Sequence, residues 1–234
     1  MKTPSTITLN NLGARLIDDG GFEDAIPYLS AAFQSSKRKF DEIYAQSGQI
    51  PTNMDQRSST VIDAYMTRDV PGDKNQEDFV YTHPIHVPPE ATKASELTIV
   101  VATTFNLAVA YHMASRVHNA ACACNGRDDL QAKINSHQLM RQALRLYQYS
   151  FRLQRTQAKS TQSPLFFMAC INNIGILFQD LGESTQAAEC FNHLLALLMY
   201  MSSVGSDDSS YFESFFQNSS RLGNEACTVG AAAA

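Results

Sequence analysis

The stretch LNNLGARLIDDGGFEDAIPYLSAA, residues 9–32, decides the fold of this chain. Counted from Leu9, the residues Leu12, Gly13 and Leu16 follow after three, four and seven positions, which is the spacing of one face of a helix. A turn follows at Gly20-Gly21, and the helical spacing resumes at Ala25. The stretch therefore predicts two amphipathic helices joined by a tight turn.

The same pattern returns near the other end of the chain, in INNIGILFQDLGESTQAAECFNHL, residues 171–194. In both copies a glycine of the first helix lies 12 residues before a small residue and 16 residues before a large apolar one. A missing side chain lets two helices approach closely, so we expect each glycine to lie against its second helix. The matched sets are Gly13, Ala25 and Leu29, and Gly175, Ala187 and Phe191.

A middle copy has the same start but a longer hairpin. Its first helix carries Ala108 at the small position, and the matching small residue of its second helix is Ala143. These residues are 35 apart instead of 12, so 23 residues are added at the turn. We interpret the addition as extra helical turns through His118 and from Asp128, with a loop at Cys124-Asn125-Gly126-Arg127.

This spacing resembles the tetratricopeptide (TPR) repeat, a helix-turn-helix unit of about 34 residues. The resemblance implies an all-α fold in which about three TPR-like hairpins form a right-handed superhelical array. We expect one domain over residues 1–234. Its predicted parts are repeat 1 (1–38), an insertion (39–95), repeat 2 (96–156), repeat 3 (163–204), a capping helix (208–222) and a flexible tail (223–234).

The predicted insertion is acidic and rich in proline. It holds five of the eight prolines and nine acidic residues against five basic ones. We expect mostly loop, with extended stretches at Phe79-Val80-Tyr81 and Ile85-His86-Val87, and a short helix or a strand from Val61 to Met66. A helix is expected to open at Pro89 and to continue to His118.

Further signals mark helix starts. Thr3-Pro4 and Ser163-Pro164 place a capping residue before a proline, which the first turn of a helix tolerates. Ser210 and Glu213 form a capping box at the start of the predicted last helix. That helix carries Phe212, Phe215 and Phe216 and is expected to cover the end of the stack.

Composition excludes several classes of protein. With 44% hydrophobic and 18% charged residues, the chain is neither collagen-like nor wholly disordered. A net charge of -5 and the lack of a basic run argue against nucleic acid as a partner. The uncharged stretch from Leu97 to Ser115 contains several polar side chains, so we expect a buried helix there and no contact with a membrane.

The N-terminus lacks the apolar run of a signal peptide, and we predict no transmembrane segment. The number of cysteines, five, is odd, and reduced thiols inside a cell are the ordinary state. We therefore expect an intracellular, cytoplasmic protein.

An asparagine recurs in register in all three repeats. Asn11, Asn106 and Asn173 each lie two residues before the small residue of the first helix. A side-chain amide both donates and accepts, so a row of such amides could hold the main chain of an extended peptide. Alternatively, each asparagine bonds a neighbouring helix and fixes the orientation of the repeat.

The run Asn10-Asn11-Leu12-Gly13, echoed by Asn172-Asn173-Ile174-Gly175, is similar to the repeats of kinesin light chains. The resemblance implies that these asparagines line a concave peptide groove. The chain departs from chaperone-binding TPR domains, which have lysine where Asn10 stands and asparagine where Ala14 stands. The residues predicted to bind a peptide are Asn10, Asn11, Phe105, Asn106, His112, Asn172, Asn173 and Gln179.

Reaction chemistry has little support in the sequence. The chain contains no phosphate-binding glycine loop, no nucleophile elbow and no zinc-protease motif, so we expect no catalytic residues and no cofactor. His118 and Cys122 share a helix face near Cys124, which would suit a soft metal. Because free cysteines are commonly small buried residues, we predict no metal site.

Two functions of different classes remain open. The first is a non-enzymatic adaptor or scaffold that binds a peptide or helix of a protein partner in the groove. The second is a structural subunit that associates with itself as a homo-oligomer and whose groove is filled by its own chain, through the insertion or the last helix. An enzyme with a His/Cys site near His118 is a third, and it would require bound metal.

Overall fold

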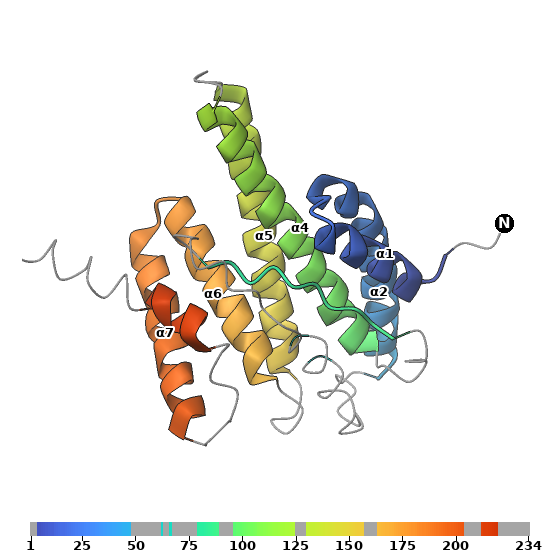
Figure 1. Ribbon diagram of the computed structural model, residues 1–234. Coiled ribbons are helices and arrows are strands. Elements are labelled where there is room, and N and C mark those ends of the chain that lie inside the picture. The colour runs from blue at the N-terminus through green and yellow to red at the C-terminus, as the bar shows by residue number, and fades with distance from the viewer. Residues whose placement is uncertain are drawn as a thin grey trace, which may run out of the picture. The chain divides into compact units, whose positions relative to one another are not determined.

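The computed structural model is all-α (Figure 1). It describes residues 4–47, 79–88, 96–124, 130–156, 163–203 and 212–219, together with Ile62 and Met66. No strand occurs among these residues. The helices are α1 (Thr6–Asp18), α2 (Phe22–Ser47), α4 (Glu96–Cys124), α5 (Leu130–Arg155), α6 (Pro164–Asp180), α7 (Ser184–Ser203) and a short last helix over residues 212–219.

The chain divides into two compact units. The N-terminal unit comprises Met1–Arg68 and Thr82–Ser163, and the C-terminal unit comprises Asp69–Tyr81 and Pro164–Ala234. In the N-terminal unit α1 packs on α2 and α4, α2 packs on α4, and α4 packs on α5. In the C-terminal unit α6 packs on α7. That the chain forms a single domain stays a prediction.

Helix α4 forms the core of the N-terminal unit. Its first part, Glu96–Ala121, is long and apolar enough to cross a membrane, but 89% of its most apolar window is buried inside the protein. Residues Val100 to Val109 are nearly all inaccessible to solvent. As expected from its polar side chains, this stretch packs as the central helix of a helical unit.

The two short hairpins have the same turn. Gly20 and Gly182 both have a φ of 78°, in the left-handed region that glycine adopts without strain. The following residue closes each turn, because Gly21 N–H donates to the Leu16 carbonyl at 2.7 Å and Glu183 N–H to the Phe178 carbonyl at 2.8 Å. Glycine therefore ends the first helix of each pair, as the sequence predicts.

Close contact at the repeated glycines is confirmed. A Cβ atom placed on Gly13 would overlap the side chain of Leu29. A Cβ atom on Gly175 would lie 2.8 Å from Cζ of Phe191. Each glycine thus leaves room for the large residue that stands 16 positions later, and that residue is buried.

Some predicted boundaries are wrong. α2 continues to Ser47, nine residues into the predicted insertion, because residues 39–47 contain neither proline nor glycine and Phe40 is buried. α1 begins at Thr6 and not at Pro4, because the Ser5 hydroxyl accepts from Thr8 N–H at 3.1 Å.

Other predicted bounds agree with the structure or fall outside it. α6 begins at Pro164 as predicted, and the long middle hairpin is confirmed, with α4 ending at Cys124 and α5 starting at Leu130. The predicted helix start at Pro89, the cap at Ser210 and the tail 223–234 lie outside the described residues. Of the expected element from Val61 to Met66, only Ile62 and Met66 are described, and both are helical.

Replacing Gly175 with alanine tests the close helix contact. Overpacking costs about 1–3 kcal/mol, and alanine regains about 1 kcal/mol of helix propensity, so Gly175→Ala should lower the free energy of unfolding by up to about 2 kcal/mol. Denaturant titration measures this change. In a Phe191→Leu background the same substitution should cost clearly less; an equal cost in both backgrounds would show that Phe191 is not the obstacle.

Candidate functional site

Residues 79–88, here called the inner segment, form no helix (Figure 1). Residues 79–81 belong to the C-terminal unit and residues 82–88 to the N-terminal unit. Pro84 and Pro88 fix their own φ angles and push the residues before them toward extended conformations. In an extended chain the N–H and C=O of one residue point to the same side, and the next residue's groups point to the opposite side. Alternate residues can therefore offer both backbone groups to the same neighbour.

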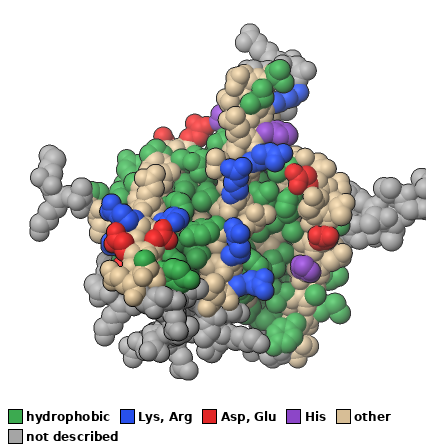
Figure 2. Space-filling model, turned by 180° about the vertical axis from the view of Figure 1, so that it is seen from behind, with side chains coloured by type: hydrophobic (Ala, Val, Ile, Leu, Met, Phe, Trp, Pro, Cys, Tyr) green, Lys and Arg blue, Asp and Glu red, His purple; other side chains and the backbone are tan. Residues whose placement is uncertain are grey.

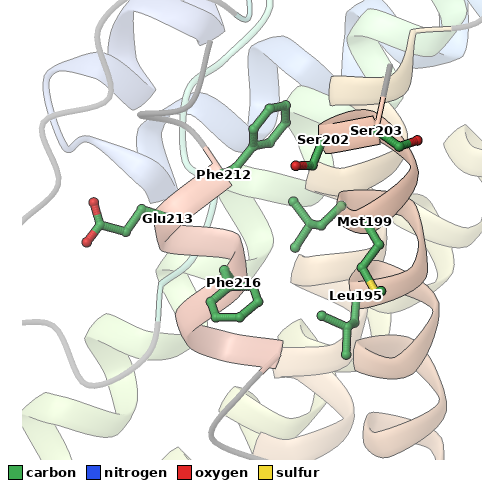
Figure 3. A pocket seen from close by; sticks show the side chains of 8 residues that line it. Leu195, Met199, Ser202, Ser203, Phe212, Glu213 and Phe216 are labelled. Atoms are coloured by element: carbon green, nitrogen blue, oxygen red, sulfur yellow. The ribbon is translucent and has the colours of Figure 1, made fainter. Parts of the chain in front are cut away.

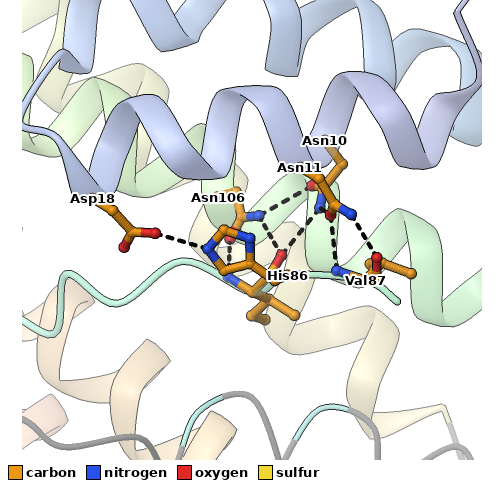
Figure 4. A network of polar contacts seen from close by, with 7 residues as sticks. Asn10, Asn11, Asp18, His86, Val87 and Asn106 are labelled. Carbon is orange, nitrogen blue, oxygen red and sulfur yellow. Dashed lines mark hydrogen bonds and ion pairs between the residues drawn. The ribbon is translucent and has the colours of Figure 1, made fainter. Parts of the chain in front are cut away.

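In the N-terminal unit two asparagines each take both backbone groups of one residue (Figure 4). Val87 N–H donates to Asn11 Oδ1 at 2.9 Å, and Asn11 Nδ2 donates to the Val87 carbonyl at 2.6 Å. Asn106 binds Ile85 in the same way, at 2.7 Å and 2.8 Å. Asn11 lies on α1 and Asn106 on α4, so two helices hold residues that are two positions apart.

A third asparagine, Asn10, ties these two together. Its Nδ2 donates to the Ile85 carbonyl at 3.0 Å and to Asn11 Oδ1 at 3.2 Å. Its Oδ1 accepts from Asn106 Nδ2 at 3.0 Å, which links α1 to α4. We call Asn10, Asn11 and Asn106 the first clamp.

The C-terminal unit holds residues 79–81 in the same manner. Asn173 of α6 exchanges two hydrogen bonds of 2.8 Å with the backbone of Tyr81. Asn218 of the last helix exchanges two with Phe79, at 3.1 Å and 2.7 Å. These bonds correspond to those of Asn11 and Asn106 in the N-terminal unit.

Asn172 completes this second set as Asn10 completes the first. It donates to the Phe79 carbonyl at 2.8 Å and to Asn173 Oδ1 at 3.1 Å, and it accepts from Asn218 Nδ2 at 2.7 Å. We call Asn172, Asn173 and Asn218 the second clamp. Both clamps consist of an Asn-Asn pair on one helix and a single asparagine from another, and each binds two residues at positions i and i+2.

The clamps recognise the main chain and not the side chains of the inner segment. Every hydrogen bond described between the six asparagines and the segment ends on a backbone N–H or C=O. The bound residues occupy odd positions, whereas Pro84 and Pro88 occupy even ones. The missing N–H groups of these prolines therefore remove no hydrogen bond from the clamps. Each asparagine amide pairs with the segment as a neighbouring strand would.

Side chains of the inner segment are part of the core. Tyr81 and Ile85 are fully buried and Val87 is 1% exposed. In the C-terminal unit Phe215 stacks on Tyr81, with ring centroids 6.1 Å apart, and meets the edge of Phe79 at 5.2 Å. The segment is thus held both by its main chain and by apolar burial.

Two histidines lie beside the bound positions. His86 Nε2 contacts Asp18 Oδ2 at 2.8 Å, on the solvent-exposed side of the first clamp (Figure 4). Burial lowers the pKa of His83, and the Asp18 carboxylate offsets part of that shift. Neither histidine belongs to a cluster of three or more metal-ligating side chains among the described residues.

Of the eight predicted site residues, three lie at the first clamp in the N-terminal unit and two at the second clamp in the C-terminal unit. The other three lie elsewhere. Phe105 is one residue away from Asn106, about 100° around the helix, and packs against the Tyr147 ring. Gln179 is exposed near the end of α6, and no hydrogen bond to the inner segment is described for it.

His112, also expected at the site, is buried in the core of the N-terminal unit. Its ring meets the Tyr147 ring edge to face at 6.1 Å, and neither ring nitrogen has a hydrogen-bond partner among the described residues. Desolvation, with a smaller contribution from the Arg116 charge, lowers the pKa of His112 to about 3. The imidazole is therefore neutral near pH 7.

Asn218 is the site residue that sequence reasoning missed. It lies outside the three repeats, so the repeat register gave no signal for it. It does follow Phe215 by three residues, which places the two on one face of the last helix. The aromatic face of this helix, which was predicted to cover the end of the stack, therefore also carries Asn218.

The metal and thiol candidates do not form a reactive site among the described residues. His118 is hydrogen-bonded to Glu23 of α2, and the side chains of Cys122 and Cys124 lie outside the described part. Burial raises the pKa of Cys170 well above its usual range and, together with the Glu189 charge, that of Cys190 to about 11. Both thiols are therefore protonated and weakly nucleophilic.

A cavity of about 530 Å³ lies in the C-terminal unit between α7 and the last helix (Figure 3). Its walls are mainly apolar, including Leu195, Met199 and Phe216. The carboxylate of Glu213 points away from it. Glu213 is the one acidic or basic side chain among the described lining residues, so these residues offer no acid–base pair for a reaction.

Comparison with known proteins gives no assignment: no protein family, no curated protein and no solved structure matches this chain.

Asn106→Ala tests the first clamp. The change leaves the buried N–H of Ile85 without a partner, and such a group costs about 1–3 kcal/mol. We expect the free energy of unfolding to fall by about 2–4 kcal/mol, since the Asn10 bond is lost as well, and the Ile85 amide to exchange faster with solvent. Gln179→Ala is the control and should stay within about 0.5 kcal/mol. Equal effects of the two substitutions would contradict a structural role for the clamp.

His112 should make the stability fall in acid. The pKa of His112 in the folded protein is about 3, which lies below its value in the unfolded chain. The contribution of His112 to the free energy of unfolding is therefore constant above about pH 6.5 and declines as the pH falls toward 3. The expected loss is about 2 kcal/mol at pH 5, at about 1.4 kcal/mol per pH unit. Denaturation at pH 7 and at pH 5 measures it. His112→Leu should remove this part of the dependence, whereas His193→Gln, which removes an exposed imidazole, should retain it.

Proposed function

We propose that the protein is a non-enzymatic, TPR-like interaction scaffold whose two clamps are filled by its own inner segment. In this proposal the inner segment is a permanent structural part of the protein, and protein partners bind on outer surfaces. One observation carries it: both clamps bind the main chain of residues 79–87 with the same hydrogen-bond pattern.

The burial of the inner segment supports a permanent occupant. Release would expose the side chains of Tyr81, Ile85 and Val87, each worth roughly 1.5–3 kcal/mol when buried. It would also leave six asparagine amides without their backbone partners in a protein interior. A free peptide would compete against a tethered segment whose effective concentration is on the order of millimolar.

The TPR-like part of the proposal rests on local features. Helical pairs occur at the three predicted places, the two short pairs share a turn, and a glycine lies against a large residue of the second helix in both. The in-register asparagines on α1, α4 and α6 resemble those of kinesin light chain repeats. A right-handed superhelical array of these hairpins is proposed on the same grounds.

The non-enzymatic part rests on the chemistry of the described side chains. The thiols of Cys170 and Cys190 are held in the protonated form, and the ring nitrogens of the buried His112 form no hydrogen bond to a described residue. The side-chain polar groups that converge within the two clamps are amides, which neither release nor take up protons near neutral pH. They suit binding to main-chain groups and not acid–base catalysis.

One observation favours a second function, an adaptor that exchanges the inner segment for a partner peptide. Because the clamps contact backbone atoms only, they would accept any extended peptide that offers the same groups at positions i and i+2. The inner segment would then act as a tethered competitor. Its release from both clamps would have to precede binding.

Two measurements on the full chain separate these functions. We expect the amides of Tyr81, Ile85 and Val87 to exchange as slowly as those of α4, and a labelled peptide of sequence FVYTHPIHVP not to bind. Fast hydrogen exchange of these amides together with binding of that peptide would support the adaptor and would contradict a permanently bound inner segment. The control peptide carries proline at the positions of Tyr81 and Ile85, which removes two N–H groups that the clamps need.

A further inference from the structure

Helix α5 has an unusual charge content. It carries five basic residues and no aspartate or glutamate over Leu130–Arg155. The whole chain has 18 basic and 23 acidic residues, so the rest of it holds 13 against 23, a net charge of -10. The positive charge is therefore concentrated on one helix of an otherwise acidic protein.

These basic residues share one exposed side of α5, apart from the face that packs on α4. The packed face contains Met140, Ala143 and Tyr147, which are buried. Lys133, His137, Arg141 and Arg145 follow one another at intervals of four, and Arg152 comes seven residues later. The basic stripe, as we call it, consists of Lys133, His137, Arg141, Arg145, Arg152 and Arg155, all exposed.

Figure 2 shows this arrangement as a column of basic side chains that runs down one helix, with a histidine near its upper end. At 1.5 Å per residue the stripe from Lys133 to Arg155 is about 33 Å long. It is narrow, and its exposed neighbours Gln138 and Gln142 are uncharged amides. No acidic residue of α5 itself interrupts it.

Two apolar residues extend the same side at the start of the helix. Leu130 is 71% exposed and Ile134 is 42% exposed. They lie four residues apart, beside Lys133. An exposed apolar pair next to a row of positive charges is a surface on which a partner side chain could anchor while its charged residues pair with the row.

We propose that the basic stripe of α5 binds an acidic helix of a partner protein, whose carboxylates recur every three or four residues. The charges are complementary, because guanidinium groups bind carboxylates with two hydrogen bonds each. The spacing also matches, since both helices repeat along their axes at the same interval. An apolar residue at one end of the partner helix would pack on Leu130 and Ile134.

The shape of the stripe favours this partner over nucleic acid and membranes. A single row of charges on a protein of net charge -5 would leave most of a duplex facing an acidic surface. A membrane would contact a broad basic and apolar face, whereas the apolar part here is two residues at one end. The stripe shares no residue with either clamp, so its test is independent of theirs.

The test uses the full chain and a synthetic helical peptide of about 22 residues, long enough to span the stripe. The peptide carries glutamate at every fourth position among alanine and glutamine, with one leucine near an end. A peptide of the same composition with glutamates distributed around the helix is the ligand control. Fluorescence anisotropy at about 50 mM and about 300 mM salt measures affinity and its screening.

Arg141→Glu/Arg145→Glu/Arg152→Glu is the decisive variant, and Arg15→Glu/Arg38→Glu/Lys39→Glu is its match in charge and exposure on α1 and α2. We expect the first to weaken binding of the aligned peptide by about tenfold or more and the second to change it by less than about threefold. Circular dichroism confirms that both variants fold.

Three results would overturn the proposal. The first is an equal loss of affinity in the two charge-reversal variants. The second is equal binding of the aligned and the distributed peptide. The third is tighter binding of a DNA duplex of about 20 base pairs, or of vesicles containing phosphatidylserine, than of the aligned peptide.

Discussion

An asparagine side chain can turn one N–H and its C=O toward the same neighbour, as a backbone does in a neighbouring strand, and this equivalence underlies the rest of the structure. An extended chain inside a helical protein has no neighbouring strand, so its N–H and C=O groups would be left unpaired at a cost of several kcal/mol in total. Asn11, Asn106, Asn173 and Asn218 each supply both partners for one residue. The helices can therefore enclose an extended segment without a sheet.

The requirement for paired amides explains other features of the chain. Asn10 and Asn172 each use both amide hydrogens, one on the segment and one on the neighbouring asparagine, so these buried polar groups are satisfied. Proline is tolerated at two positions of the inner segment because neither position faces a clamp. The close packing at Gly13 and Gly175 holds the helices that carry the Asn-Asn pairs.

The amides of the interior are thus already used by the chain itself, which changes where a partner would bind. If the protein is the scaffold proposed above, its partners would bind on outer surfaces, where the charge differs from helix to helix. α5 is the clearest case, because its basic side chains are exposed on one side while the rest of the chain is acidic. Side-chain charges there can select a partner, whereas backbone-directed amides cannot.

The sequence by itself determined the helices, the two glycine turns, the close contact at Gly13 and Gly175 and the common phase of Asn11, Asn106 and Asn173. These follow from local periodicity and from the size of single residues, which can be read within one hairpin. It also indicated extended stretches at 79–81 and 85–87, because proline and β-branched residues disfavour helix there.

Only the tertiary structure decided what the asparagines bind and that Asn218 joins them. The residues that meet at the clamps are separated by up to 139 positions in the chain, and an amide forms the same bonds with any backbone, so no side-chain pattern marks its partner. Phe105 and His112 lie outside the clamps for a related reason: the repeat phase gives the position along a helix, but it does not show that these two rings pack against Tyr147.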